Sequence, residues 1–556
     1  MSFKLRALFI ISTFFAQLPT SQAEGPKGPQ SDLVNLPRVR FQYNSKQYAG
    51  YLNPGDDMKY FYWYLESQGN PTTDPLLVWF SSYPGCSSLI SLLNEIGPFR
   101  TNTDGISLYE NVFSWNKVAN LLFIDSPAGV GWSLSSGKAS TPNDDTVANY
   151  NYQALRDFMS TKFPQYNSTS TRLYLAGEAY SGVFVLTLAK TILDNVAKKV
   201  FPDILKGIAI GNGALSASYQ MNAMINTFYQ RGLIGTDTWD DLLNRCLCSP
   251  PSASAENCKF YTAITSSPTS DCAKAVNSVI QYVQTNTSVD GTNILRDCYG
   301  TASSQPKKSS YDSDESSFDS VGYFPPGTRK VDTVSAANTA PSSARDPAHL
   351  INYDSTDALL GFSCWGNESK YLAQIDVMKA LHVDQSFYNK PFVSCASNFQ
   401  YNQSAAYYEM DTTISALLQK SVKLLFYSGD LDVEYSFLGQ EWYLDRNLAK
   451  KFNWKVEEAR GQWLYRGQTA GFTKRYTNVD EVIVKGAGRN VPMDRAGPAL
   501  QMINSFLKGL GYSTASGLNV DPKPNGGNSV INAVPFTTFW AEMAFFLISS
   551  VLAQVL

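Results

Sequence analysis

Histidine is almost absent from this chain: its 556 residues include only two, His349 and His382. Zinc sites made of cysteine and histidine are therefore not expected, and no cysteine spacing matches a zinc-binding pattern. Neither sign of charge is in excess, because 45 Lys and Arg stand against 48 Asp and Glu, without a basic or acidic block. The sequence predicts no metal, no cofactor and no nucleic-acid partner.

The eight cysteines are better explained by disulfides than by metal binding. Their number is even, and five of them crowd between residues 246 and 298. Disulfides persist in oxidising compartments, which indicates the secretory route. Four Asn-x-Ser/Thr triplets are candidate glycosylation sites on that route; they begin at Asn167, Asn286, Asn367 and Asn402.

Residues 1–23 predict a secretory signal peptide. Lys4 and Arg6 precede an apolar run over residues 7–18, and small residues follow as a cleavage site. The apolar run is too short to span a bilayer as a helix. We therefore exclude this segment from the fold and expect the protein outside the cell, at the cell surface or in the lysosome.

The last 21 residues, 536–556, form an apolar tail interrupted only by Glu542, after a linker over 511–535. About 20 apolar residues would cross a bilayer, yet no Lys or Arg follows to hold a cytoplasmic end. Small residues near 525–527, a spacer and an apolar end are typical of a glycolipid-anchor (GPI) signal. A tail-end membrane helix and an ordinary buried or disordered tail are the alternatives.

Strand-like and helix-like segments alternate along most of the chain. Residues 36–85 alternate in the manner of strands, and helical patterns cover 146–162, 181–198 and 497–510. Further buried strands are expected at NLLFID (120–125), RLYLAG (172–177), LKGIAIGNG (205–213), VKLLFYSGD (422–430) and VDEVIVKGAG (479–488). Such alternation predicts an α/β fold, with a central, mostly parallel sheet and helices on both faces.

We expect one domain over residues 24–510 with an insertion at about 215–365. The insertion contains most of the cysteines and interrupts the strand–helix rhythm. Within it, residues 302–347 are rich in Ser, Pro and Asp and poor in apolar side chains. Such a composition buries too little surface to order itself, so a flexible segment is predicted there.

Several segments together resemble the serine carboxypeptidases of the α/β-hydrolase fold. The match extends in order over nearly all of residues 30–510; its main motifs are YPGCSSLISLLNEIGPF (83–99), NLLFIDSPAGVGWS (120–133), LYLAGEAYSG (173–182), YSGDLDVEYSFLGQEW (427–442) and VKGAGRNVPMDRAGPALQMINSFL (484–507). The resemblance implies an α/β-hydrolase fold whose insertion is a disulfide-rich cap. It also implies the disulfides Cys86–Cys395, Cys298–Cys364, Cys246–Cys272 and Cys248–Cys258.

The catalytic triad of this family needs a nucleophile, a base and an acid that orients the base. The resemblance places the acid at Asp432, which is retained. It places the nucleophile at Ala179, whose methyl group cannot attack a carbonyl. It places the base at Arg489, whose guanidinium stays protonated and has no lone pair to accept a proton. We expect Arg489 and Asp432 to form a charge-assisted hydrogen-bonded pair in the cleft that holds the catalytic triad in active members of the family.

No other residue replaces the missing groups. Ser181 lies two residues past the bend, where a helix would turn it about 200° away from the direction of Ala179. His382 lies at the end of a helical stretch, and His349 lies in the flexible-looking segment. Both histidines are therefore expected to be structural or solvated.

The substrate-binding positions also depart from the family pattern. The motif NGGPGC reads SSYPGC here, so Ser81, Ser82 and Tyr83 replace an asparagine and two glycines. Backbone N–H groups of Tyr83 and Tyr180 are the oxyanion-hole candidates, although a tyrosine side chain at position 83 would crowd the pocket.

Two family carboxylates that bind the C-terminal carboxylate of a peptide correspond to Glu95 and Glu178. Ser81 takes the place of their asparagine partner. Like charges held close raise one pKa, so such a pair would favour acidic pH. Two interpretations stay open at this point, a retained carboxylate site or a buried hydrogen-bonded pair that supports the bend.

Losing the serine or the histidine of such a triad costs roughly 10⁶-fold in rate. The sequence therefore predicts a secretory serine carboxypeptidase-like protein that is inactive as a peptidase and binds a peptide or protein partner. The alternative is an active carboxypeptidase with unorthodox residues that works at acidic pH. An acyltransferase on the same scaffold would need the same serine and histidine. A second copy of the chain, in a homodimer, and a membrane, contacted through the C-terminal tail, are further possible partners.

Overall fold

The structure, a computed structural model, describes residues 28–55, 57–135, 141–248, 258–287, 289–296, 353–354, 367–396 and 399–522. The expected signal peptide, the segment 302–347, the apolar tail, His349 and the Cys298–Cys364 pair lie outside these residues. Over the described ranges, no helix has both the length and the apolar character needed to cross a bilayer.

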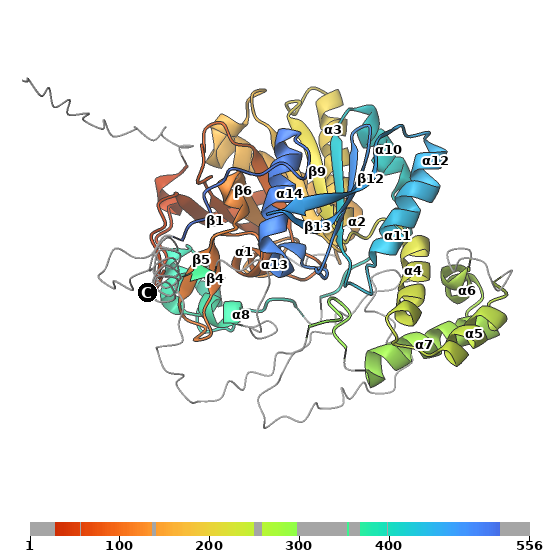
Figure 1. Ribbon diagram of the computed structural model, residues 1–556. Helices are drawn as coiled ribbons and strands as arrows, with labels where there is room; N and C mark the ends of the chain where they lie inside the picture. Colours follow the sequence, from red (N-terminus) through yellow and green to blue (C-terminus); the bar gives the residue numbers. More distant parts are fainter. Residues whose placement is uncertain are drawn as a thin grey trace, which may run out of the picture.

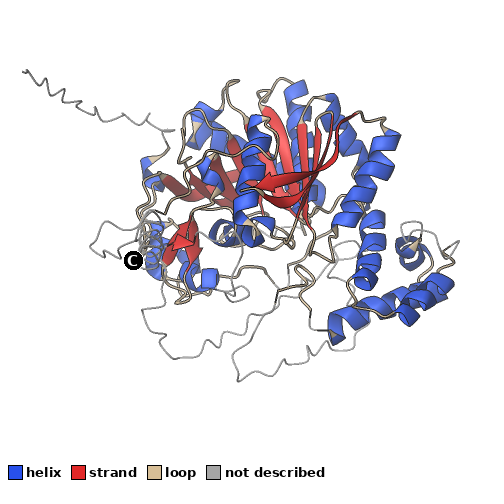
Figure 2. Ribbon diagram, viewed as in Figure 1, coloured by secondary structure: helices blue, strands red, loops and turns tan. Residues whose placement is uncertain are grey.

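An eleven-stranded sheet forms the centre of the molecule (Figures 1 and 2). Its strands follow the order β1 (Gln47–Gly55), β2 (Met58–Leu65), β6 (Asn120–Ile124), β3 (Leu76–Phe80), β8 (Leu173–Glu178), β9 (Leu205–Gly211), β11 (Lys423–Gly429), β14 (Val479–Val484), β13 (Gln468–Tyr476) and β12 (Val456–Tyr465), with β7 (Leu134–Ser135) paired to β2. All neighbours from β6 to β14 pair in parallel, and the strands at both ends are antiparallel. The expected α/β fold with a mostly parallel sheet is confirmed.

Helices cover both faces of this sheet, so its strands are buried on both sides. Alternate residues of β2 enter two separate cores, with Tyr60, Tyr62 and Tyr64 on one face and Phe61, Trp63 and Leu65 on the other. The first core includes α2 (Asp144–Asp157) and α3 (Ser181–Ala197), and the second includes α1 (Leu89–Asn94) and α14 (Ala496–Lys508). Burial of these aromatic and aliphatic side chains drives the packing, at about 25 cal/mol per Å² of apolar surface.

The expected insertion is largely helical where it is described. It contains α4 (Ala217–Gln230), α5 (Thr236–Arg245), α6 (Phe260–Ser266) and α7 (Asp271–Asn286). Figure 1 shows α5, α6 and α7 set apart from the sheet, beyond α4. Disulfides Cys246–Cys272 and Cys248–Cys258 tie this group together, and Cys86–Cys395 joins segments 309 residues apart. These three pairs are those that the resemblance implies.

A small second sheet and several short helices complete the described chain. The sheet has the order β10 (Tyr353–Asp354), β5 (Leu108–Asn111) and β4 (Phe99–Thr101). The further α-helices are α8 (Asn367–Leu372), α9 (Ile375–Ala380), α10 (Asp411–Gln419), α11 (Phe437–Glu441), α12 (Ala449–Lys451) and α13 (Val491–Asp494).

Three of the central parallel strands end at the loops that contain the expected triad positions. The loop after β8 contains Ala179, the loop after β11 contains Asp432, and the loop after β14 contains Arg489. Because the carboxyl ends of parallel strands meet at one edge of the sheet, these loops come together there. His382 is elsewhere: its ring bonds to the Ala49 carbonyl on β1, at one end of the sheet.

Candidate active site

The turn from β8 into α3 keeps the sharp bend on which α/β-hydrolases hold a nucleophile. Ala179 at the bend has φ of 51°, a left-handed conformation that costs a residue with a side chain roughly 1–2 kcal/mol. Its N–H donates to the Gly211 carbonyl at 2.9 Å, and its carbonyl accepts from the Ala214 N–H at 2.9 Å. The bend is therefore fixed by the neighbouring strand β9 and the loop after it, but it presents a methyl group.

The nearby serine is bound to the backbone of β8. Ser181 Oγ donates to the Glu178 carbonyl at 2.7 Å and accepts from the Glu178 N–H at 2.7 Å. It lies so close to Gly177 that a Cβ there would come within 2.2 Å of the Oγ. The hydroxyl is fully buried, so its role in the structure is to close the bend.

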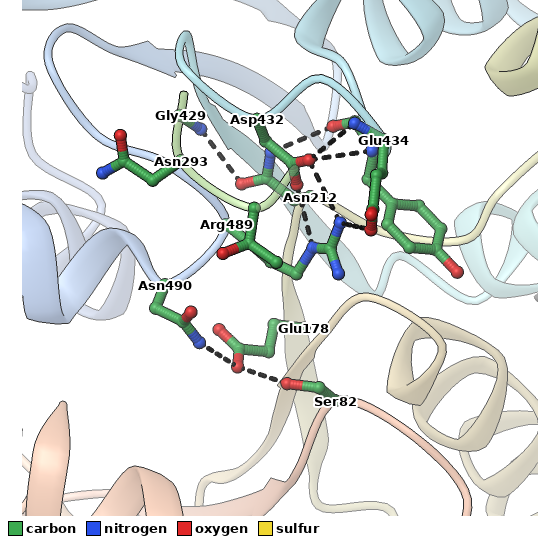
Figure 3. Close-up of polar contacts among 12 residues, drawn as sticks. Ser82, Glu178, Asn212, Asn293, Gly429, Asp432, Glu434, Arg489 and Asn490 are labelled. Atoms are coloured by element: carbon green, nitrogen blue, oxygen red, sulfur yellow. Dashed lines mark hydrogen bonds and ion pairs between the residues drawn. The ribbon is translucent and has the colours of Figure 1, made fainter. Parts of the chain in front are cut away.

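Arg489 and Asp432 form a buried, bidentate ion pair (Figure 3). Arg489 Nε donates to Asp432 Oδ2 at 3.0 Å, and Nη2 donates to Oδ1 at 3.1 Å. Asp432 also accepts the backbone N–H groups of Glu434 and Tyr435, at 2.9 and 3.0 Å. The carboxylate that would orient a histidine in an active triad instead binds a guanidinium, as the sequence predicts for these two positions.

Three further side chains surround the guanidinium, and the sequence did not point to two of them. Glu434 Oε2 accepts from Arg489 Nη2 at 2.5 Å, and the Tyr435 ring centre lies 4.8 Å from Arg489 Cζ. Tyr83 accepts from Nη1 at 2.5 Å through its hydroxyl. The available signal for Glu434 and Tyr435 was their position directly after the acid in the motif GDLDVEY.

The charge on Arg489 is permanent in this environment. Burial by itself lowers the pKa of an arginine, but the negative charges of Asp432 and Glu434 more than offset that effect. The pKa of Arg489 is therefore raised well above its usual value, and the side chain cannot take a proton from a nucleophile.

The side chains of the two oxyanion-hole candidates, Tyr83 and Tyr180, form hydrogen bonds with other side chains. The Tyr83 hydroxyl contacts Arg489, as described above. The Tyr180 hydroxyl donates to Asp144 Oδ1 at 2.7 Å, and Tyr401 donates to the same oxygen at 2.8 Å. Tyr180 is thus anchored to the beginning of α2, which fixes the first residue after the bend.

The carboxyl groups of Glu95 and Glu178 are buried in the interior and share one hydrogen-bond donor, Asn490. Asn490 Nδ2 donates to Glu178 Oε1 at 2.8 Å and to Glu95 Oε1 at 3.3 Å. The serine that bonds to Glu178 Oε1 is Ser82, at 2.6 Å, whereas Ser81 is its buried neighbour. Figure 3 shows Ser82 and Asn490 on either side of the Glu178 carboxyl group; the sequence pointed to neither as its partner.

Burial favours the protonated form of both carboxyl groups. Burial raises the pKa of Glu95 to about 7, and burial together with the charge of Glu95 raises the pKa of Glu178 well above its usual value. Glu95 Oε2 and Glu178 Oε2 have no hydrogen-bond partner within the described residues. A carboxyl group without a donor at one oxygen is less costly to bury in its protonated, neutral form.

We expect the protein to lose stability as the pH rises from about 4.5 to above 7. Over this range the folded carboxyl groups hold protons that the unfolded chain has released. The free energy of unfolding therefore falls by about 1.4 kcal/mol per pH unit for each group. Burial raises the pKa of Glu66 and Asp125 to about 7, which adds to the trend. Thermal unfolding measured between pH 4.5 and 8 checks this expectation.

Glu178→Gln tests the source of this pH dependence, because glutamine imitates the protonated carboxyl at every pH. The variant should match the original protein near pH 5 and show a smaller decline toward pH 8. Glu457→Gln, at an exposed position on β12, is the matched control and should leave the decline unchanged. An undiminished decline in Glu178→Gln would contradict a raised pKa of Glu178.

Among the described residues, no group of three or more His, Cys, Asp or Glu side chains is arranged to hold a metal ion.

The model of the serine carboxypeptidase family matches residues 37–509, which include all the central strands and the three loops of the site. The chain belongs to the serine carboxypeptidase family.

Two relatives match this chain over the same region. Serine carboxypeptidase ctsa-4.1 of Caenorhabditis elegans is 34% identical over 494 residues, which cover 87% of this chain and 95% of that protein. The lysosomal protective protein of Mus musculus is 32% identical over 486 residues, or 86% of this chain and 94% of that protein. This serine carboxypeptidase homologue is thus similar to its relatives over nearly their whole length.

A solved structure shows the same fold. It is Kex1(delta)p, a prohormone-processing carboxypeptidase from Saccharomyces cerevisiae, with a TM-score of 0.60. The match covers 87% of this chain and 96% of that one, at 20% sequence identity. At this identity the likeness supports the fold of the family and not its chemistry.

Proposed function

We propose that this member of the serine carboxypeptidase family does not hydrolyse peptides and acts by binding a peptide or protein partner. The observation that carries the proposal is the buried pair of Arg489 and Asp432 beside a bend that presents Ala179. Hydrolysis needs a hydroxyl that gives up a proton and a base that receives it. Neither group is present at these positions.

The carboxyl pair supports the structural interpretation more than a retained carboxylate site. Glu178 Oε1 already accepts from Ser82 and Asn490, and Glu95 is 2% exposed. A peptide carboxylate would have to displace these donors to reach the buried pair. We therefore infer that Glu95 and Glu178 support the bend, and that partner binding uses other surfaces.

We propose the secretory or lysosomal route as the location of the protein. The disulfides support it, since such bonds persist in oxidising compartments. The name of the mouse relative, lysosomal protective protein, points the same way. The sequon residues Asn167, Asn286 and Asn402 are exposed, as glycosylation requires.

The direct test is a hydrolysis assay on the purified protein with blocked dipeptides, between pH 4 and pH 8. We expect no release of the C-terminal residue above the buffer rate at any pH, while an active carboxypeptidase assayed in parallel gives turnover. Turnover that survives purification and disappears in Ser181→Ala would show that the neighbouring serine is the nucleophile. That result would overturn the proposal. Turnover that disappears on substitution of any other single residue would overturn it as well.

A further inference from the structure

The environment of Arg489 has the composition of a guanidinium-binding site. We call its four walls the guanidinium cage: Asp432, Glu434, Tyr83 and Tyr435. Two walls are carboxylates that accept from two nitrogens of the guanidinium: Asp432 accepts from Nε and Nη2, and Glu434 accepts from the same Nη2. The other two are tyrosines, with ring centres 5.7 and 4.8 Å from Arg489 Cζ.

This geometry fits a planar guanidinium better than an ammonium ion. Asp432 receives two N–H groups side by side, at 3.0 and 3.1 Å, which a single ammonium nitrogen cannot supply from one direction. A third nitrogen, Nη1, donates to the Tyr83 hydroxyl. The aromatic rings add an attraction for a flat, weakly hydrated cation.

Two walls of the cage, Asp432 and Glu434, have contacts that do not involve the Arg489 side chain. Asp432 is held by two backbone N–H groups of its own loop. The segment 289–296 lies against that loop, and the Val433 N–H donates to the Gly291 carbonyl at 3.0 Å. Gly291 packs so closely on Glu434 that a Cβ there would lie 2.5 Å from Glu434 Oε1. The same segment receives the Arg489 backbone N–H at the Thr292 carbonyl, at 2.8 Å.

We propose that the former catalytic centre is a binding site for a guanidinium group, which Arg489 fills as an internal ligand and which a free guanidinium compound fills when that side chain is shortened. The ligand class is thus a guanidinium cation, as in an arginine side chain. The proposal rests on the proposed function only in treating Arg489 as a fixed cation. Its test measures binding and not hydrolysis, so either can fail alone.

The experiment uses the full-length variant Arg489→Ala and methylguanidinium at up to about 20 mM. We expect methylguanidinium to raise the melting temperature of the variant in a saturable way, by about 2 °C or more, and to leave the original protein unchanged. Methylammonium controls for charge without the planar shape, and N-methylurea controls for the shape without the charge. Neither should reproduce the rise.

A second variant identifies the walls. Glu434→Gln in the Arg489→Ala background should weaken methylguanidinium at least several-fold, because one of the two anionic walls is lost. Gly291→Ala in that background should also weaken it, since the added methyl group displaces the Glu434 carboxylate. Gly235→Ala is the matched control, because a Cβ there meets nothing within 4 Å.

If Arg489→Ala does not fold by itself, refolding with each compound takes the place of the melting curve. Methylguanidinium should then increase the yield of folded protein, and the two control compounds should not. An equal response to methylguanidinium and methylammonium, an equal response in the original protein, or no response in either format would overturn the proposal.

Discussion

Arg489→Met should lower the free energy of unfolding by about 3–5 kcal/mol, because it leaves the buried Asp432 carboxylate without its cation. Asp432 is fully buried at its side chain, and the Arg489 side chain is 4% exposed, so water cannot replace the lost partner. Methionine keeps most of the volume of the side chain, which limits the contribution of an empty cavity. Urea unfolding followed by fluorescence measures the change.

Two further variants separate the charge from other effects of this substitution. Asp432→Asn combined with Arg489→Met should be more stable than Arg489→Met alone, because one uncompensated charge is removed. Arg245→Met breaks an exposed ion pair with Asp241 on α5 and should leave stability nearly unchanged. If Arg489→Met were as stable as the original protein, the buried pair would not hold the site together.

Ala179→Ser with Arg489→His should produce a hydroxyl that reacts with a fluorophosphonate, yet hydrolysis far below that of an active carboxypeptidase. Full restoration of a triad is worth roughly 10⁶-fold in rate. Several departures remain in the double variant, since Glu434 loses its cation and the Tyr83 side chain still occupies the site. The values of kcat/KM on a blocked dipeptide near pH 5 measure the gain.

Extending the double variant tests which departures matter. Adding Tyr83→Gly and Glu434→Gln should raise kcat/KM by a further factor of about 10 or more, because the guanidinium cage is then opened and its spare charge removed. Each single variant, Ala179→Ser and Arg489→His, should stay inactive because the triad works as a unit. A single Ala179→Ser variant as fast as the double would show that another residue already serves as the base.

The sequence predicted the central strands well because each is buried on both faces. Residues 120–125, 172–177, 205–213, 422–430 and 479–488 were expected as strands, and they contain β6, β9, β11 and β14 together with all but the last residue of β8. The hairpin of β12 and β13 was not expected. Its residues 456–462 are all exposed, so neither a continuous apolar run nor an alternating pattern marks them.

The pair of Arg489 and Asp432 was predictable because both positions follow from family motifs. The partners of Glu178 were not, since they depend on packing between distant segments. Asn490 donates to Glu178 across 312 residues of sequence, and Ser82 donates across 96. Polar side chains at such separations show no periodicity that would pair them in advance.

Labelling of the unmodified, purified protein with a fluorophosphonate probe, read by intact-mass spectrometry, tests the central claim most directly. The probe reacts fast and stoichiometrically with a hydroxyl that a neighbouring base has activated. With a methyl group at position 179 and a permanently protonated guanidinium at position 489, the account predicts no stoichiometric mass increase at any pH from 4 to 8. A stoichiometric adduct that maps to one serine or threonine of the folded protein, and that is lost on unfolding, would contradict it.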